Sequence, residues 1–238
     1  MTGFQKDILS FGIQIEASQI DQFLKYYKLL AEWNTYMNLT AITDFESVLQ
    51  KHFVDSLSLV KAVPDLNQVS YSLIDVGTGA GFPGIPLKIV FPDLKVTLLD
   101  SLQKRVLFLE KVISELNLQD IKVIHGRAED YAKPGQLREE FDLCVSRAVA
   151  NLSTLSEYCL PFVKVGGAFV SYKSEKITEE YEKAKSAIKT LGGKYENQIE
   201  FFLPGSDLYR NLFLIRKENV TPLKYPRKAG TPSKDPIS

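Results

Sequence analysis

The sequence predicts an α/β fold, in which a doubly wound, mostly parallel sheet with an antiparallel edge strand follows an N-terminal helical extension. From about residue 72 onward, short apolar runs typical of buried strands alternate with helical patterns, which favours a parallel sheet covered on both faces. The first of these runs ends in a loop rich in glycine. The last two strand patterns lie too close together for a parallel crossover, so at least one of them should run antiparallel at the edge.

Residues 1–63 carry the helical signals of the extension. Ser18 and Asp21 form a plausible start signal for a first helix, and a second helical pattern consists of Leu49, Phe53 and Leu57. Apolar residues on one face of the first helix are Ile20, Phe23, Leu24, Tyr27 and Leu30. The segment that starts at Pro64 then leads into the core as a linker.

Residues 64–216 form the expected core, and residues 217–238 form a basic tail. Pro83 and Pro86 lie in the first turns of the helix expected after the glycine loop. Proline is tolerated there because amide groups at the start of a helix have no acceptor within the helix. The tail has four prolines in its last eighteen residues, which predicts an extended rather than a helical chain. The expected strands are 72–76, 96–99, 121–124, 141–145, 168–172, 199–203 and 211–215, and the later helices are 102–116, 151–160 and 177–191.

The composition limits the function classes. With 29 basic and 29 acidic residues, the chain lacks a global positive charge for nucleic acid, although residues 216–238 carry a local excess of basic side chains. It has neither an apolar run of the ~18 residues that span a bilayer nor a secretion signal, so we expect a cytoplasmic protein without membrane contact. Cys144, Cys159, His52 and His125 lack the spacing of a zinc site, and we expect no metal.

The run LIDVGTGAGFPGIPL, residues 73–87, is the most informative motif. It ends a strand pattern in closely spaced glycines, and Asp100 closes the next strand pattern nineteen positions after Gly81, a geometry that predicts a nucleoside pocket. The dinucleotide fingerprint has glycine at loop positions one, three and six, but here position six is Phe82. Glycines at one, three and five (Gly77, Gly79 and Gly81) instead resemble the first motif of Rossmann-like class I methyltransferases, which bind S-adenosylmethionine. Asp100 would then accept hydrogen bonds from the ribose hydroxyls.

The fourth strand bears on the acceptor atom. Residues 141–149 read FDLCVSRAV and contain neither an Asp/Asn-Pro-Pro-aromatic loop nor a Pro-Cys pair, the motifs that commonly serve amino-group and cytosine-C5 methylation. A site without an activating base suits a lone pair that is already nucleophilic, such as guanine N7. Arg147 is either a planar donor to phosphate, carboxylate or a base edge, or a surface ion-pair residue.

Nearly end to end, the chain closely resembles the bacterial 16S ribosomal RNA guanine-N7 methyltransferases, the glucose-inhibited division protein B family. The motifs that carry the resemblance are WNTYMNLTAIT (33–43), KHFVDSL (51–57), DVGTGAGFPGIPL (75–87), GRAED (126–130), SRAVA (146–150) and YPRKAGTPSKDPI (225–237). The resemblance implies transfer of a methyl group from S-adenosyl-L-methionine to guanine N7 of 16S rRNA, naked or in a small-subunit assembly particle. It implies no obligate protein partner, and we expect a monomer.

The resemblance further implies roles for individual residues. The donor would contact Gly77, Gly79, Phe82, Asp100, Ser101, Ala128 and Glu129, with Asp100 at the ribose and Glu129 near the adenine. Arg147 would face the methionine end or the guanine and orient it, with no general base. Asn38, Lys51, His52 and Asp55 match motifs that suggest a wall of the RNA cleft, and Arg227 and Lys228 would contact phosphates.

Several alternatives stay open at this point. The chain could be a class I methyltransferase for a different RNA, a protein or a small molecule, or a non-catalytic module that senses a nucleoside. A dinucleotide dehydrogenase is disfavoured by Phe82, and the glycine run could be a turn without a ligand. His52 could be a packing or capping histidine, and Arg227 and Lys228 could be solvated charges.

Overall fold

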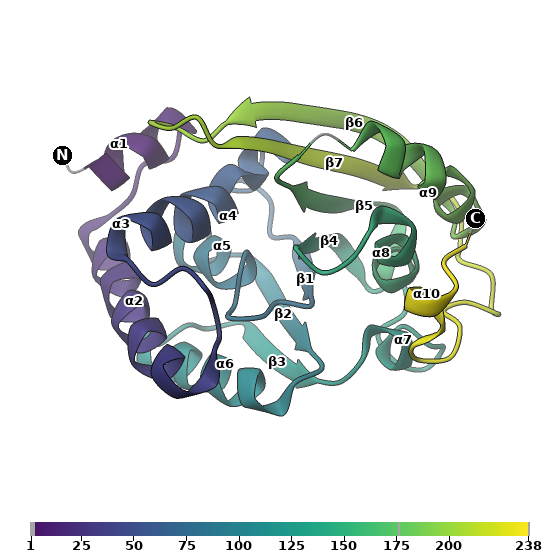
Figure 1. Ribbon diagram of the computed structural model, residues 1–238, viewed down its shortest axis with the longest axis horizontal. Coiled ribbons are helices and arrows are strands. Elements are labelled where there is room, and N and C mark those ends of the chain that lie inside the picture. Colours follow the sequence, from purple (N-terminus) through teal and green to yellow (C-terminus); the bar gives the residue numbers. More distant parts are fainter. Residues whose placement is uncertain (1–2, 176, 238) are drawn as a thin grey trace.

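A twisted, largely parallel sheet forms the centre of the protein. The computed structural model describes residues 3–175 and 177–237, and within them the strands follow the order β3-β2-β1-β4-β5-β7-β6 (Figure 1). β1 to β5 are parallel, and β7 runs antiparallel to both of its neighbours. The strands are β1 (Ser72–Val76), β2 (Lys95–Asp100), β3 (Ile121–His125), β4 (Phe141–Arg147), β5 (Val163–Lys173), β6 (Gly193–Phe202) and β7 (Tyr209–Lys217).

The predicted fold class is therefore confirmed, including the antiparallel strand. That strand, β7, is inserted between β5 and β6, so that β6 forms the outer edge. The hairpin of β6 and β7 is also longer than the sequence pattern indicates. The outer strand β6 is mostly exposed and contains few apolar residues. An apolar run in the sequence therefore marks only part of it.

Helices cover both faces of the sheet (Figure 1). Successive strand residues such as Leu73 and Ile74 belong to two separate hydrophobic cores because side chains alternate across a sheet. The first core includes residues of α1 (Gly3–Ser10), α2 (Ala17–Met37), α4 (Asp55–Leu57), α5 (Gly84–Val90) and α6 (Gln103–Glu115). The second includes residues of α8 (Leu152–Cys159) and α9 (Thr178–Thr190), and both cysteines are buried there.

The long helix α2 differs from its prediction in two details. It begins one residue earlier than Ser18, with a capping box formed by Glu16 and Gln19 rather than by Ser18 and Asp21. Its buried residues are Phe23, Tyr26 and Leu30, whereas Leu24 is 39% exposed. In this orientation, the buried hydroxyl of Tyr26 donates a hydrogen bond to the carbonyl oxygen of Ala80 in the glycine loop.

Short helical segments connect the extension to the core and end the chain. The pattern of Leu49, Phe53 and Leu57 is buried, on a continuous run of α3 (Phe45–Val48), a π-helical turn (Leu49–Val54), α4 and a 3₁₀ turn (Ser58–Lys61). The small helix α7 (Ala128–Tyr131) follows β3, and a 3₁₀ turn (Leu160–Phe162) precedes β5. The tail is not wholly extended, because Pro232 lies in the first turn of α10 (Thr231–Lys234), where proline is well tolerated. No helix of the described residues is both long and apolar enough to cross a bilayer.

Candidate functional site

A cleft of about 1700 Å³ lies at the carboxyl ends of the parallel strands. The strand order reverses between β1 and β4, and this reversal is where open α/β sheets bind ligands. The cleft walls come from the glycine loop after β1, the ends of β2, β4 and β5, the start of β7, the segment before α4, and the C-terminal tail. Of the residues expected at the site, those that line the cleft are Lys51, His52, Asp55, Gly77, Gly79, Phe82, Asp100, Ser101 and Arg147.

Three glycines of the loop, Gly77, Gly79 and Gly81, have backbone conformations that other residues rarely adopt. Gly77 has φ 71°, and a Cβ there would lie 2.6 Å from the Val149 Cγ2 atom. Gly79 has φ 64°, but a Cβ there would meet nothing within 4 Å. Among the described residues, no neighbouring atom would meet a side chain at position 79, and Gly79 lines the cleft.

Two buried carboxylates support the loop. Asp100 is buried, and its Oδ2 accepts a hydrogen bond from the Gly79 amide at 2.9 Å. The same oxygen forms an ion pair with Arg105 at 3.2 Å. Oδ2 of Asp75 accepts hydrogen bonds from the Thr78 hydroxyl at 2.7 Å and the Gly84 amide at 2.9 Å. Its buried Oδ1 has no hydrogen-bond partner within the described part of the chain. Burial raises the pKa of Asp75 to about 6. The unpartnered oxygen is suited to a cationic or N–H group of a ligand.

His52 is held as a neutral ring against Phe82. The two rings stack with centroids 4.4 Å apart, and His52 Nε2 lies 2.9 Å from the Thr40 hydroxyl. Nδ1 lies 3.3 Å from a guanidinium nitrogen of Arg147, a donor, and 3.2 Å from the carbonyl oxygen of Lys51, an acceptor, so its contacts fit either neutral tautomer. Burial, together with the positive charge of Arg147, lowers the pKa of His52 to about 3. The histidine is therefore uncharged near neutral pH.

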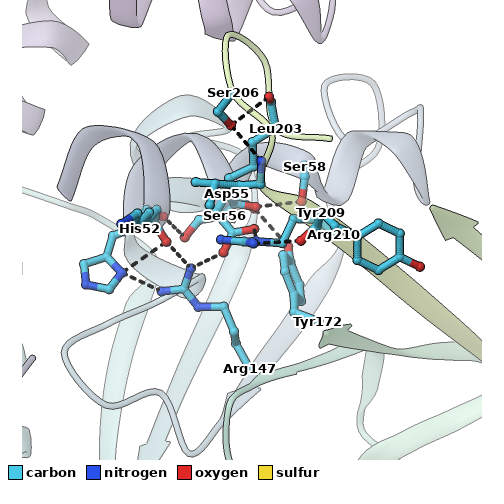
Figure 2. A network of polar contacts seen from close by, with 12 residues as sticks. His52, Asp55, Ser56, Ser58, Arg147, Tyr172, Leu203, Ser206, Tyr209 and Arg210 are labelled. Carbon is cyan, nitrogen blue, oxygen red and sulfur yellow. Dashed lines mark hydrogen bonds and ion pairs between the residues drawn. The ribbon is translucent and has the colours of Figure 1, made fainter. Parts of the chain in front are cut away.

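Asp55 joins two arginines from different strands (Figure 2). Its Oδ2 pairs with Arg147 Nη1 and its Oδ1 with Arg210 Nε, each at 2.8 Å. Arg147 also donates to the Lys51 carbonyl at 3.1 Å, and its guanidinium lies 5.3 Å from the centroid of Phe82. Two positive charges and one buried negative charge thus face the cleft, and this wall keeps a net positive charge suited to an anion.

Arg210 is a charged cleft residue that sequence reasoning missed. It is near the start of β7 and lies 155 residues after Asp55, its partner. The signal available in the sequence is a charged residue one position before the strand pattern NLFLI. That pattern is equally typical of a solvated strand end, so only the fold reveals the contact.

Five expected residues are not among those that line the cleft in the described structure: Asn38, Ala128, Glu129, Arg227 and Lys228. Asn38 ends α2 in the left-handed conformation, with φ 51°, a helix-capping position. Glu129 is buried and accepts a hydrogen bond from the Gly230 amide at 2.8 Å. The guanidinium of Arg227 pairs with Glu157 at 2.7 Å, whereas Lys228 is exposed.

Comparison with known proteins gives a consistent result. The family GidB, rRNA small subunit methyltransferase G, matches residues 19–207. A ribosomal RNA small subunit methyltransferase G of Acetivibrio thermocellus is 54% identical over 228 residues, which cover 96% of this chain and 93% of that protein. One of Lachnoclostridium phytofermentans is 52% identical over 234 residues, 98% of this chain and 96% of that protein. Among solved structures, the YcgJ protein of Bacillus subtilis superposes with a TM-score of 0.53 at 13% identity, over 71% of this chain and 100% of that one, which is a likeness of fold alone.

Proposed function

The chain belongs to the rRNA small subunit methyltransferase G family, and we propose that it transfers a methyl group from S-adenosyl-L-methionine to N7 of a guanine in 16S ribosomal RNA. The observation that carries the proposal is the cleft at the strand reversal, where the glycine loop and Asp100 adjoin a wall with Arg147 and Arg210. A donor pocket and an anion-binding wall in one cleft are what methyl transfer to a nucleic acid requires.

The residues present fit the methyl donor. The space beside Gly79 lets the donor approach the backbone, and Asp100 retains lone pairs for ribose hydroxyls. We propose that the buried Oδ1 of Asp75, which has no partner among the described residues and does not itself line the cleft, meets the cationic amino group of the methionine moiety through water. When bound, S-adenosylmethionine supplies a methyl group on a positively charged sulfur.

The protein's own residues act by orientation rather than by proton transfer. N7 of guanine carries a lone pair and no proton, so attack needs no general base, and a neutral His52 is consistent with this. We propose that Arg147 donates to O6 of the guanine, which leaves the N7 lone pair free, while Asp55 and His52 hold the guanidinium in place. Phe82 stacks on His52 and so helps to fix the position of that ring.

The RNA backbone would follow the positive side of the cleft. Lys51 and Arg210 lie on the cleft and Lys228 is exposed on the tail, so we propose that these three residues contact phosphates. The zero net charge then suits a structured RNA or an assembling particle bound through a local patch. We place this activity in the cytoplasm and propose that the chain acts as a monomer.

Transfer of tritium from labelled S-adenosylmethionine tests the proposal. Purified 16S rRNA, small-subunit particles and lysate protein from cells lacking this chain serve as acceptors in parallel. We expect label in the rRNA or the particle. Label confined to protein or small molecules would favour a different class I methyltransferase, and donor binding without any acceptor would favour a sensing module.

A further inference from the structure

The basic C-terminal segment, residues 222–237, is docked on the core beside α7 and α8 (Figure 1). The Thr154 hydroxyl donates to the Pro232 carbonyl at 3.1 Å, and the Ser153 hydroxyl donates to the Ile237 carbonyl at 2.6 Å. Both donors are in the first turn of α8, and Pro232 is buried. These contacts hold the segment at α10 and again at Ile237.

Arg227 is the main anchor of this segment. Its backbone amide donates to Glu157 Oε1 and its Nη2 donates to Glu157 Oε2, both at 2.7 Å. Its Nη2 also donates to the Asp235 carbonyl at 2.7 Å. Glu157 is only 1% exposed, so this arginine is the counter-charge of a buried carboxylate. A guanidinium committed in this way has little left to offer a phosphate.

The docked segment contacts α7, after β3, and reaches the cleft near its end. The Gly230 amide donates to Glu129 Oε1 at 2.8 Å, and Gly230 has φ 84°, a conformation that favours glycine. Glu129 is 4% exposed and follows β3 at the carboxyl edge of the sheet, two strands from the glycine loop. Pro236 and Ile237 line the cleft directly.

We infer that the C-terminal segment is a positioning element of the donor pocket, held by the Arg227–Glu157 pair, and that donor binding and docking of this segment stabilise each other. The inference rests on the proposed function, because it takes the cleft beside Gly79 as the donor pocket. Reciprocity follows from linkage: if docking of the segment raises donor affinity, a bound donor must strengthen docking by the same factor.

The test uses the product S-adenosylhomocysteine as the probe on the full chain. Calorimetry measures its Kd, and hydrogen–deuterium exchange measures protection of peptides that cover 226–237. In the unmutated protein, we expect the probe to slow exchange in these peptides. Arg227→Met should raise the Kd of the probe about tenfold, the size of a moderate coupling.

Two further variants separate positioning from general instability. Arg227→Met leaves Glu157 without a counter-charge, so the double variant Arg227→Met with Glu157→Gln removes that buried charge and should recover folding while keeping the weaker probe binding. Lys234→Met, an exposed basic residue of the same segment, is the matched control and should bind the probe normally.

The inference is overturned if the folded double variant binds the probe within twofold of the unmutated protein, or if the probe leaves exchange in 226–237 unchanged. Failure of the proposed function has a different signature. An unmutated protein that binds the probe but methylates no rRNA would refute the acceptor and leave the positioning role in place, whereas absence of probe binding would refute both.

Discussion

Replacement of Asp55 by asparagine is the most direct perturbation of the cleft wall. Asp55 is 4% exposed, and the side chains of Arg147 and Arg210 are 13% and 14% exposed. Asparagine has nearly the same shape, but its one carbonyl oxygen can accept from only one of the two guanidinium groups. Its NH₂ group would face the donor of the other, and two positive charges would remain without a counter-charge.

The expected cost follows from these contacts. Breaking a buried ion pair costs ~3–5 kcal/mol, and one charge-assisted hydrogen bond contributes ~1.5–3 kcal/mol. Because both arginines face an open cleft and asparagine keeps one acceptor, we expect the lower end, about 3 kcal/mol of the free energy of unfolding. With an m value of ~2–3 kcal/mol/M, the urea midpoint should fall by about 1 M.

Urea denaturation and steady-state methyl transfer check this prediction together. The kcat of Asp55→Asn should fall about 100-fold, because a misplaced Arg147 no longer orients the guanine. Glu182→Gln breaks a surface pair whose side chains are 50% and 58% exposed and should cost less than ~0.5 kcal/mol. A loss below ~1 kcal/mol in Asp55→Asn, or an unchanged kcat, would refute the reasoning.

Three further predictions follow from the same cleft. The pKa of His52 is about 3 in the folded protein and ordinarily 6.5, so the unfolded state binds more protons between pH 3 and pH 6.5. The free energy of unfolding therefore decreases as the pH falls through this range, by about 2 kcal/mol at pH 5. His52→Gln should lose this part of the pH dependence in urea titrations, and parallel curves for the two proteins would contradict it. Gly79→Ala should weaken S-adenosylhomocysteine binding at least tenfold in calorimetry and cost ~1–2 kcal/mol of stability. The control Gly166→Ala, at a glycine with a positive φ and open surroundings away from the cleft, should cost the same stability but leave binding unchanged. Equal affinities of the two variants for S-adenosylhomocysteine would show that the loop does not face the donor. Lys228→Gln should reduce the salt dependence of RNA binding by about one charge without changing donor affinity, and an unaltered salt slope would remove Lys228 from the RNA contacts.

Local patterns were sufficient for the architecture of the core. The apolar strand runs and the glycine spacing are properties of neighbouring residues, and β1 with its loop lies where Leu73 to Leu87 predicts. The helix register was harder, because Tyr26 rather than Leu24 faces the core through a hydrogen bond to Ala80. A polar hydroxyl on a helix gives no sequence signal for such a distant partner.

The charged contacts of the site could not be read from the sequence because their partners are remote. Arg227 and Glu157 are 70 residues apart, and a basic side chain among prolines has the pattern of a solvated charge. Asp55 and Arg210 are even more distant. Such pairs depend on which distant segments the topology brings together, and Arg210 reaches the cleft because β7 pairs with β5.

The position and chemistry of the transferred methyl group test the central proposal most directly. 16S rRNA from cells lacking this chain would be incubated with the purified protein and S-adenosylmethionine, then treated with borohydride and aniline, which cleave RNA at 7-methylguanosine. We predict one new cleavage site in 16S rRNA, absent without the methyl donor. Methylated rRNA that resists cleavage, or that carries the methyl group on another base, would contradict the assignment of guanine N7.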